Sequence, residues 1–595
     1  MSKHFSPSTE VEQIPRGMKR LSIVLMVSIL TACAAAPPKP ASSDVAQAAT
    51  PIETPHPPAA AIASAHADAT AAGFEILDAG GNAFDAAIAV SAVLSVVEPI
   101  SSGIGGGGFV LVHRASDGRD AFIDARETAP ASAHPARYLD ADGNLDRDRS
   151  VNGPWSAGIP GQPAAWVHLS EKYGRLPLLR SLAPAIRIAE NGFPVYPRLE
   201  SGYARRADVM QRYPGTRAVF LADGDPPQVG ERLKQPDLAH TLRLLGEQGF
   251  DGFYRGDIAQ KLIDGVNREG GEWTAEDLAG YRVREREPLR FRYRDWDVIT
   301  APPPSSGGVA LAEILNMVSA WNLAELPRAE RVHLLVEAMR RAYRDRTIYL
   351  GDPDFVSMPL ARLTSRDYAA GLRATIHPGR ATPSDLLPGQ PAPLEDEETT
   401  HFVVMDKEGN VVSSTQTVNL LYGSGLIPEG TGVLLNDEMD DFALKPGTPN
   451  AFGVMGFEAN AVAPGRRMLS SMSPTFMRNG DSFMALGTPG GSRIITMVLL
   501  GMLGFDDGLD PQAVTALPRY HHQWLPDVIL AESDALDADT IQALEAMGHT
   551  VVVREDSWGN MHALSWNRAS GEVKAGSDPR HPEAKASVRS TGSAD

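Results

Sequence analysis

From about residue 60 to about residue 580, apolar residues recur with two spacings that alternate along the chain. In some stretches they recur at helical spacing, as in the Ala/Val-rich segment that ends before Pro99. In others they form short β-rich runs, as in FVLVH at 109–113. Neither a low-complexity linker nor a fixed-period repeat interrupts this pattern. The sequence therefore predicts one large folded unit that contains both helices and antiparallel hairpins.

The first hairpin is predicted in TTHFVVMDKEGNVVSSTQT, which begins at Thr399. Two β-rich runs flank a Gly/Asn turn, which is typical of antiparallel strands. With Asp406 opposite Val411, Thr417 falls opposite Thr400 and beside Thr399. This register predicts that two threonine hydroxyls lie together at the open end of the hairpin, and ordinary strand propensity is the alternative reason for a threonine at 417.

A second hairpin is predicted in SSMSPTFMRNGDSFMALGTPGG, where the Asn-Gly dipeptide at 479–480 marks a turn that pairs Arg478 with Asp481. This register groups four residues at the open end of the hairpin: Ser470, Ser471, Gly490 and Gly491. The Pro-Gly-Gly segment can point backbone N–H groups at a ligand, although such a segment is more often only a turn.

A third hairpin, with a turn at Asp117-Gly118, delivers Arg126 to the end of its second strand. An arginine at that place either faces a functional loop or carries an ordinary surface charge.

Composition then excludes several classes of protein. The chain has 595 residues, a formal net charge of −19 and a single cysteine, Cys33. The excess of carboxylates argues against a general nucleic-acid binder, because such a surface repels phosphate backbones. One cysteine allows neither an intrachain disulfide nor a cysteine-based zinc or iron–sulfur site.

The N-terminus predicts export. From Met18, a possible true start, two cations precede an apolar run that is too short to span a bilayer, and Leu30 to Cys33 resemble the lipobox of bacterial lipoproteins. We therefore expect a signal peptide over 1–32, a lipidated Cys33 and an Ala/Pro-rich tether to residue 58. Ala34 favours the periplasmic face of the outer membrane. An ordinary leader with an incidental cysteine is the alternative.

Other motifs are rejected. GIGGGGF at 103–109 lies between a predicted helix and a strand, the reverse of the order that a dinucleotide-binding loop needs. P-loop, HExxH and GxSxG motifs do not occur. The pair His521-His522 has no carboxylate at helical spacing, so we expect no metal there, and nothing else in the chain suggests one.

A dozen segments in one continuous order resemble bacterial gamma-glutamyltransferases, also called gamma-glutamyltranspeptidases. They include DARETAP, PPPSSGG, AYRDRTIYLGDPDF, TTHFVVMDKEGN, LLNDEMDDF, LSSMSPT, GTPGGSR and PRYHHQWLPD. The resemblance implies an α+β N-terminal nucleophile hydrolase fold, a four-layer αββα sandwich with two stacked antiparallel sheets. It also implies self-cleavage between Glu398 and Thr399 into a large subunit, 59–398, and a small subunit, 399–595, which stay together as a heterodimer. Separately, the polar composition of residues 580–595 predicts a frayed tail.

The resemblance also implies a role for each candidate residue. Thr399 would be the nucleophile and Thr417 its hydrogen-bonding partner. The remaining assignments are Gly490 and Gly491 as an oxyanion hole, Arg126, Ser470 and Ser471 as partners of the substrate carboxylate, Asn419, Glu438 and Asp441 as acceptors for its ammonium, and Phe452 in a lid where a tyrosine is common.

The implied substrates are glutathione and other gamma-glutamyl compounds, with water, amino acids or dipeptides as acceptors, and the implied reaction needs no cofactor. Membrane contact would come from the lipid anchor alone. A relative tuned to another acyl group, such as a cephalosporin acylase, and a non-catalytic binding module are the alternatives.

Overall fold

Two stacked antiparallel sheets form the centre of the structure, a computed structural model that describes residues 56–221, 224–384 and 399–590. The seven-stranded sheet has the order β18 (Lys585–Ser590), β1 (Ala59–Ser64), β9 (Thr400–Met405), β10 (Val411–Thr417), β2 (Gly107–Arg114), β3 (Arg119–Ala125) and β6 (Arg284–Arg286). The six-stranded sheet has the order β17 (Val573–Ser577), β16 (His562–Asn567), β12 (Ser482–Gly487), β11 (Thr475–Asn479), β8 (Trp296–Thr300) and β7 (Leu289–Tyr293). The predictions for the leader, for Cys33 and for Glu398 lie outside the described residues.

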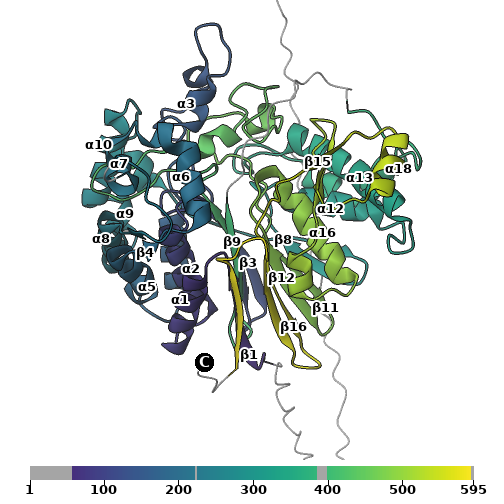
Figure 1. Cartoon of the computed structure of the whole chain (residues 1–595), viewed down its shortest axis with the longest axis horizontal. Coiled ribbons are helices and arrows are strands. Elements are labelled where there is room, and N and C mark those ends of the chain that lie inside the picture. The colour runs from purple at the N-terminus through teal and green to yellow at the C-terminus, as the bar shows by residue number, and fades with distance from the viewer. Residues whose placement is uncertain (1–55, 222–223, 385–398, 591–595) are drawn as a thin grey trace, which may run out of the picture. The chain divides into compact units, whose positions relative to one another are not determined.

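Helices cover the outer face of each sheet (Figure 1). Over the seven-stranded sheet lie α1 (Ala67–Asp78), α2 (Ala83–Val97) and α4 (Gln162–Lys172), backed by α5 (Leu178–Asn191) and α8 (Pro236–Gln248). Over the six-stranded sheet lie α12 (Gly307–Val318), α13 (Arg328–Tyr349) and α16 (Ile494–Asp506). The predicted αββα sandwich is therefore confirmed.

Shorter elements connect these layers. The remaining helices are α3 (Arg147–Val151), α6 (Pro197–Met210), α7 (Pro214–Phe220), α9 (Asp251–Tyr254), α10 (Gly256–Arg268), α11 (Ala275–Gly280), α14 (Leu360–Leu363), α15 (Arg366–Arg373), α17 (Pro511–Thr515) and α18 (Ala538–Ala546). Two small sheets contain β4 (Phe193–Pro194) with β5 (Arg232–Leu233), and β13 (Tyr520–His521), β14 (Ile529–Glu532) and β15 (Val551–Arg554). Short 3-10 turns lie at η1 (Pro135–Tyr138), η2 (Glu438–Asp441), η3 (Glu458–Asn460) and η4 (Gly491–Arg493).

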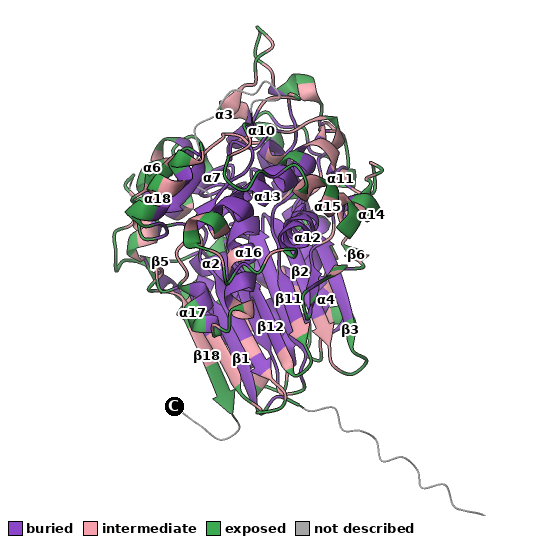
Figure 2. Ribbon diagram, turned by 90° about the vertical axis from the view of Figure 1, so that its right-hand side faces the viewer, coloured by how far each residue is buried: buried purple, intermediate pink, exposed green. Residues whose placement is uncertain are grey.

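The seven-stranded sheet is buried on both faces because apolar side chains of its strands point alternately to one face and to the other. On β1, Ala61 and Ala63 belong to the core between the two sheets, whereas Ile62 belongs to the core under α1 and α2. Successive side chains of a strand point to opposite faces, so one strand supplies both cores. Figure 2 shows the resulting burial across the central strands.

The first hairpin forms as predicted, but its register differs by one residue. Thr400 pairs with Gln416 rather than with Thr417. Asp406 causes the difference, because its backbone N–H donates to the carbonyl of Asn410 at 3.1 Å and its side chain accepts the N–H of Asn410 at 3.0 Å. These bonds close a loop one residue shorter than expected, so Thr417 lies level with Thr399.

The second hairpin turns at Gly480-Asp481, and the predicted pairing of Arg478 with Asp481 is wrong. Asn479 pairs with Ser482 instead. Gly480 has a φ of 51°, which is the conformation that a two-residue hairpin turn requires of a glycine in its first position. The dipeptide signal therefore located the turn correctly to within one residue.

The third hairpin is confirmed. β2 and β3 pair Arg114 with Arg119 around the predicted turn at 117–118, and Arg126 directly follows β3.

The expectation of a frayed C-terminal tail is wrong for residues 585–590. These residues form β18, which pairs with β1 from Lys585 opposite Ser64 to Ser590 opposite Ala59. The segment is polar because β18 is an edge strand, whose outer side needs no apolar residues.

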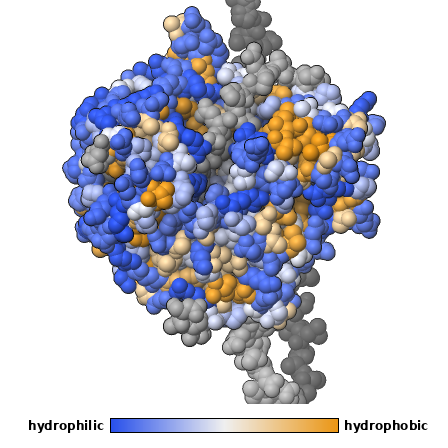
Figure 3. Space-filling model, in the orientation of Figure 1, coloured by the Kyte–Doolittle hydropathy of each residue, from blue (hydrophilic) through white to orange (hydrophobic). Residues whose placement is uncertain are grey.

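The surface is mostly hydrophilic on the face shown in Figure 3, with apolar side chains confined to separate patches. Exposed valines at 552 and 553 lie on the edge strand β15. Among the described helices, none combines the length and the apolar character needed to cross a membrane.

Candidate active site

Two threonine hydroxyls face each other where β9 begins and β10 ends. Thr399 Oγ1 donates a hydrogen bond to Thr417 Oγ1 at 3.1 Å, and both residues are buried. Thr417 Oγ1 also accepts the backbone N–H of Asn419 at 2.7 Å. The second bond fixes the Thr417 hydroxyl, so the oxygen of Thr399 is held in one place at the open end of the hairpin.

Gly490 and Gly491 lie beyond β12, where the chain enters η4 and then α16. Their φ angles are 129° and 48°, conformations that L-residues with side chains rarely adopt. Within the described residues, no hydrogen bond uses the backbone N–H of either glycine. Two free donors at the start of a helical segment form a site for a negative charge.

Arg126 lies fully buried after β3 and forms ion pairs with Glu438 and Asp441, both from η2. Its Nε donates to the carbonyl of Met468 at 3.3 Å, and Glu127 lies 3.5 Å from its Nη1. Burial opposes the positive charge, but the surrounding carboxylates outweigh it and raise the pKa of Arg126. The guanidinium is therefore charged and fixed in its orientation.

The carboxylates around Arg126 are costly to ionise. Burial raises the pKa of Glu127 to about 7, and burial also raises the pKa values of Glu438 and Asp441. Arg126 opposes these shifts, but one cation faces three carboxyl groups. The three carboxyl groups therefore titrate as one interacting group, each with its pKa above the ordinary value.

The remaining predicted polar residues also converge on this region. Asn419 has a φ of 84° and donates through Nδ2 to the carbonyl of Asp437 at 3.0 Å. Ser470 receives the backbone N–H of Met472 on its Oγ at 3.1 Å. The hydroxyl of Ser471 accepts from Arg346 at 3.3 Å.

Residues 445–453, the segment predicted to form a lid, follow η2, and two of them, Asn450 and Phe452, line the same pocket as Thr399. The backbone carbonyl of Phe452 accepts a hydrogen bond from Gln523 Nε2 at 3.1 Å, and the N–H of Ala451 donates to Asp440 at 2.7 Å. The Phe452 ring is buried in a small apolar cluster with Val151 and Leu420. Phe452 thus lines the pocket with an aromatic residue that lacks the hydroxyl of a tyrosine.

A single pocket collects these side chains. Its lining contains ten of the eleven residues predicted for the catalytic, substrate-binding and lid positions: Arg126, Thr399, Thr417, Asn419, Glu438, Asp441, Phe452, Ser470, Ser471 and Gly491. Gly490, the eleventh, is the residue before Gly491.

The lining also contains residues that the sequence analysis did not single out, among them Arg346, Asn450 and Ser492. Asn450 donates to Asp441 at 3.0 Å, and Ser492 donates to Gln523 at 2.6 Å. Arg346 lies in AYRDRTIYLGDPDF, a segment noted in the sequence, but nothing in its local pattern distinguished it from the arginines beside it.

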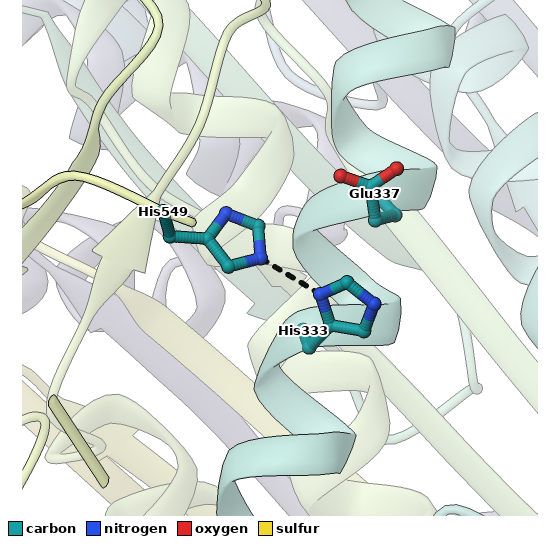
Figure 4. Close-up of side chains that lie close together, drawn as sticks. All are labelled: His333, Glu337 and His549. Atoms are coloured by element: carbon teal, nitrogen blue, oxygen red, sulfur yellow. Dashed lines mark hydrogen bonds between the residues drawn. The ribbon is translucent and has the colours of Figure 1, made fainter. Parts of the chain in front are cut away.

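A second polar cluster lies away from this pocket, where His333 and Glu337 of α13 meet His549 (Figure 4). Their potential ligand atoms lie within 4.8 Å of one another. His333 donates through Nε2 to the carbonyl of His377 at 2.9 Å, so its Nδ1 accepts the Nε2–H of His549 at 2.7 Å. Burial, with His333 beside it, lowers the pKa of His549 to about 4.

Glu337 in this cluster already has strong partners. Its carboxylate accepts from Arg341 at 2.8 Å and from the N–H of Thr382 at 3.0 Å. His522 lies in the same neighbourhood and is within 3.2 Å of Asp527. Because the donor atoms are engaged in these bonds, we assign the cluster a structural role in joining α13 to the segment after α18.

The chain is similar to known proteins in both sequence and structure. The sequence model of the gamma-glutamyltranspeptidase family matches residues 69–588. A glutathione hydrolase proenzyme of Pseudomonas sp. (strain A14) is 46% identical over 490 residues, covering 81% of this chain and 84% of that protein. A glutathione hydrolase proenzyme of Escherichia coli (strain K12) is 39% identical over 577 residues, covering 95% and 98%. The crystal structure of a cephalosporin acylase from Bacillus halodurans is similar with a TM-score of 0.80 at 30% identity, covering 92% and 98%.

Proposed function

The chain belongs to the gamma-glutamyltranspeptidase family, and from that premise we propose that it is a proenzyme whose Thr399 first cleaves its own chain and then transfers gamma-glutamyl groups. The protein is a gamma-glutamyl hydrolase and transferase. The observation that carries the residue assignment is the hydrogen bond from Thr399 to Thr417 inside the pocket that contains Arg126 and Gly491.

Maturation uses the Thr399 hydroxyl as an internal nucleophile. Its Oγ1 attacks the carbonyl carbon of Glu398, the Thr399 nitrogen leaves, and an ester replaces the peptide bond. Water then opens the ester, which releases the carboxylate of Glu398 and the free α-amine of Thr399. The hydroxyl proton ends on the nitrogen that leaves, and Thr417 supports the step by accepting a hydrogen bond that orients the attacking hydroxyl.

The free α-amine then serves as the base for turnover. An unperturbed α-amine has a pKa of about 7.7 to 8.0, so an appreciable fraction is neutral near pH 7.5 and can take the hydroxyl proton. Thr399 Oγ1 attacks the gamma-carbonyl carbon, the C–N bond breaks, and the amine half of the donor leaves with a proton. Water resolves the ester to glutamate, whereas an acceptor amine resolves it to a new gamma-glutamyl amide.

The pocket supplies the other requirements of this reaction. The N–H groups of Gly490 and Gly491 would stabilise the oxyanion, and loss of one such donor typically costs about 10² to 10³ in rate. Arg126, Ser470 and Ser471 would bind the α-carboxylate of the donor, while Asn419, Glu438 and Asp441 would accept from its α-ammonium. The donors expected are glutathione and related gamma-glutamyl amides.

The N-terminal pattern extends the proposal to location. A leader over 1–32, followed by Cys33 and a tether to residue 58, favours export and lipidation, with the enzyme on the periplasmic face of the outer membrane. Replacement of Cys33 by alanine should move the protein from the membrane fraction to the soluble periplasmic fraction. Membrane association that survives Cys33→Ala would contradict the lipid anchor.

The chain is also similar to a cephalosporin acylase, and a related acylase would differ from a gamma-glutamyl transferase in the acyl group that it accepts. Arg126 and Asp441 together match an α-amino acid, whereas a glutaryl chain has a carboxylate but no ammonium. Initial rates on gamma-glutamyl-p-nitroanilide and on glutaryl-p-nitroanilide test the difference. We expect the former to react faster, and faster release from the glutaryl compound would favour the acylase.

A further inference from the structure

Arg346 is a buried cation that faces the pocket without a carboxylate partner of its own. It lies on α13, is only 7% exposed, and lines the pocket together with Thr399 and Ser471. Within the described residues, no carboxylate lies within ion-pair distance of its guanidinium. Burial lowers the pKa of Arg346, an effect that the nearby Asp441 partly opposes.

The two arginines of the pocket therefore differ in their partners: Arg126 has carboxylates and Arg346 has hydroxyl groups. Arg126 is matched by Glu438 and Asp441, whereas the polar contacts of Arg346 are two hydroxyl groups. Its Nε donates to Ser306 Oγ at 2.9 Å and its Nη2 donates to Ser471 Oγ at 3.3 Å. A buried charge is costly unless it is paired, so the pocket gains most from an anion on the Arg346 side.

The two serines connect Arg346 to the segment predicted to bind the substrate. Ser306, at the start of α12, donates through both its backbone N–H and its hydroxyl to the carbonyl of Ser470, at 2.7 and 2.8 Å. Ser471 accepts from Arg346, so its own hydroxyl proton can be donated to a ligand. Arg346 thus polarises the Ser471 hydroxyl and fixes the position of the 470–471 segment.

We propose that Arg346 is a second cation for the α-carboxylate of the gamma-glutamyl donor, and that it acts through its charge and through the hydroxyl of Ser471. The proposal rests on the proposed function and adds a specificity residue to the same pocket. Arg126 is ion-paired with the η2 carboxylates that face the ammonium, while Arg346 supplies a positive charge that forms no ion pair with any described carboxylate.

Three p-nitroanilide donors separate recognition of the carboxylate from a general structural effect. Gamma-glutamyl-p-nitroanilide carries both charged groups, glutaryl-p-nitroanilide lacks the ammonium, and 4-aminobutyryl-p-nitroanilide lacks the carboxylate. Hydrogen bonds to charged groups contribute about 1.5 to 3 kcal/mol, which corresponds to about 10- to 150-fold in kcat/KM. Arg346→Gln should show that loss on the two carboxylate-bearing donors and less than about threefold on the third.

Controls keep the outcomes distinct. Arg344→Gln changes an arginine on the same helix that is 46% exposed and lies 3.4 Å from Asp345, and it should leave all three rates unchanged. Arg346→Lys should retain part of the preference for the carboxylate-bearing donors. Self-cleavage of each variant, followed by gel electrophoresis, reports whether the fold around Thr399 is intact.

An equal loss on all three donors, or a failure of both Arg346 variants to self-cleave, would overturn the proposal because either result assigns Arg346 a structural role. A loss too small to measure on any donor would overturn it as well. If wild-type protein is inactive on all three donors, the proposed function itself fails, and that result is distinct from any pattern confined to Arg346.

Discussion

The hydroxyl of Thr417 should control how fast the chain cleaves itself. Thr417→Val keeps the shape of the side chain but removes the oxygen that accepts from Thr399 Oγ1 and from the N–H of Asn419. The buried N–H of Asn419 loses its acceptor, which costs about 1 to 3 kcal/mol, and Thr399 loses the contact with Thr417 that orients its hydroxyl. We expect cleavage to slow by about 5- to 150-fold, since each 1.4 kcal/mol corresponds to a factor of about ten.

Cell-free synthesis followed by gel electrophoresis measures this rate, because the single chain is seen before it is processed. Thr417→Ser keeps the oxygen and should cleave within about threefold of the wild-type rate. Thr400→Val is a matched control on the same hairpin, since Thr400 Oγ1 is buried without a hydrogen-bond partner. Wild-type cleavage by Thr417→Val, or equal slowing by Thr400→Val, would refute the assignment of Thr417.

Three further predictions follow from the same contacts. Gly491→Ala places a side chain at a φ of 48° beside the pocket and should lower kcat by at least about 10²-fold. The rate is measured on gamma-glutamyl-p-nitroanilide after self-cleavage of the variant is confirmed, and an unchanged kcat would contradict the oxyanion role. Gln523→Leu removes the donor to the Phe452 carbonyl and should raise KM more than it lowers kcat, whereas a change in kcat alone would argue against a lid held by Gln523. The pKa of His549 is lowered to about 4 in the folded chain, so the unfolded chain binds more protons between about pH 4 and about pH 6.5. The free energy of unfolding should therefore decrease as pH falls from about 6.5 to about 4, by up to about 3 kcal/mol from this residue. His549→Gln should flatten that part of the pH dependence of Tm, and an unchanged slope would show that His549 titrates normally.

Sequence patterning predicted the hairpins because their signals are local. Alternating β-rich runs with a Gly turn fixed the position of each hairpin, and the order of motifs fixed the family. The pairing of the first hairpin was wrong by one residue and that of the second by two, because the register depends on how each turn closes. Asp406 shortens the first loop through its own side-chain hydrogen bonds, which no strand propensity encodes.

Local sequence patterns predicted neither the place of Arg346 in the pocket nor the strand formed by residues 585–590. Arg346 lies near other arginines on α13, and only the packing of α13 beside Ser306 and Ser471 gives it a place in the pocket. Residues 585–590 are polar enough to suggest fraying, yet they complete the edge of a sheet through backbone bonds to β1. In both cases a long-range contact, which a local pattern does not record, decides the role of the segment.

Intact mass and N-terminal sequence of the purified protein, beside a Thr399→Ala variant, test the central claim most directly. We predict that the wild-type protein separates under denaturing conditions into two chains, the smaller of which begins Thr-Thr-His-Phe, and that the variant remains whole. A wild-type protein that stays a single chain yet turns over gamma-glutamyl-p-nitroanilide would contradict the claim that Thr399 acts through its own freed α-amine.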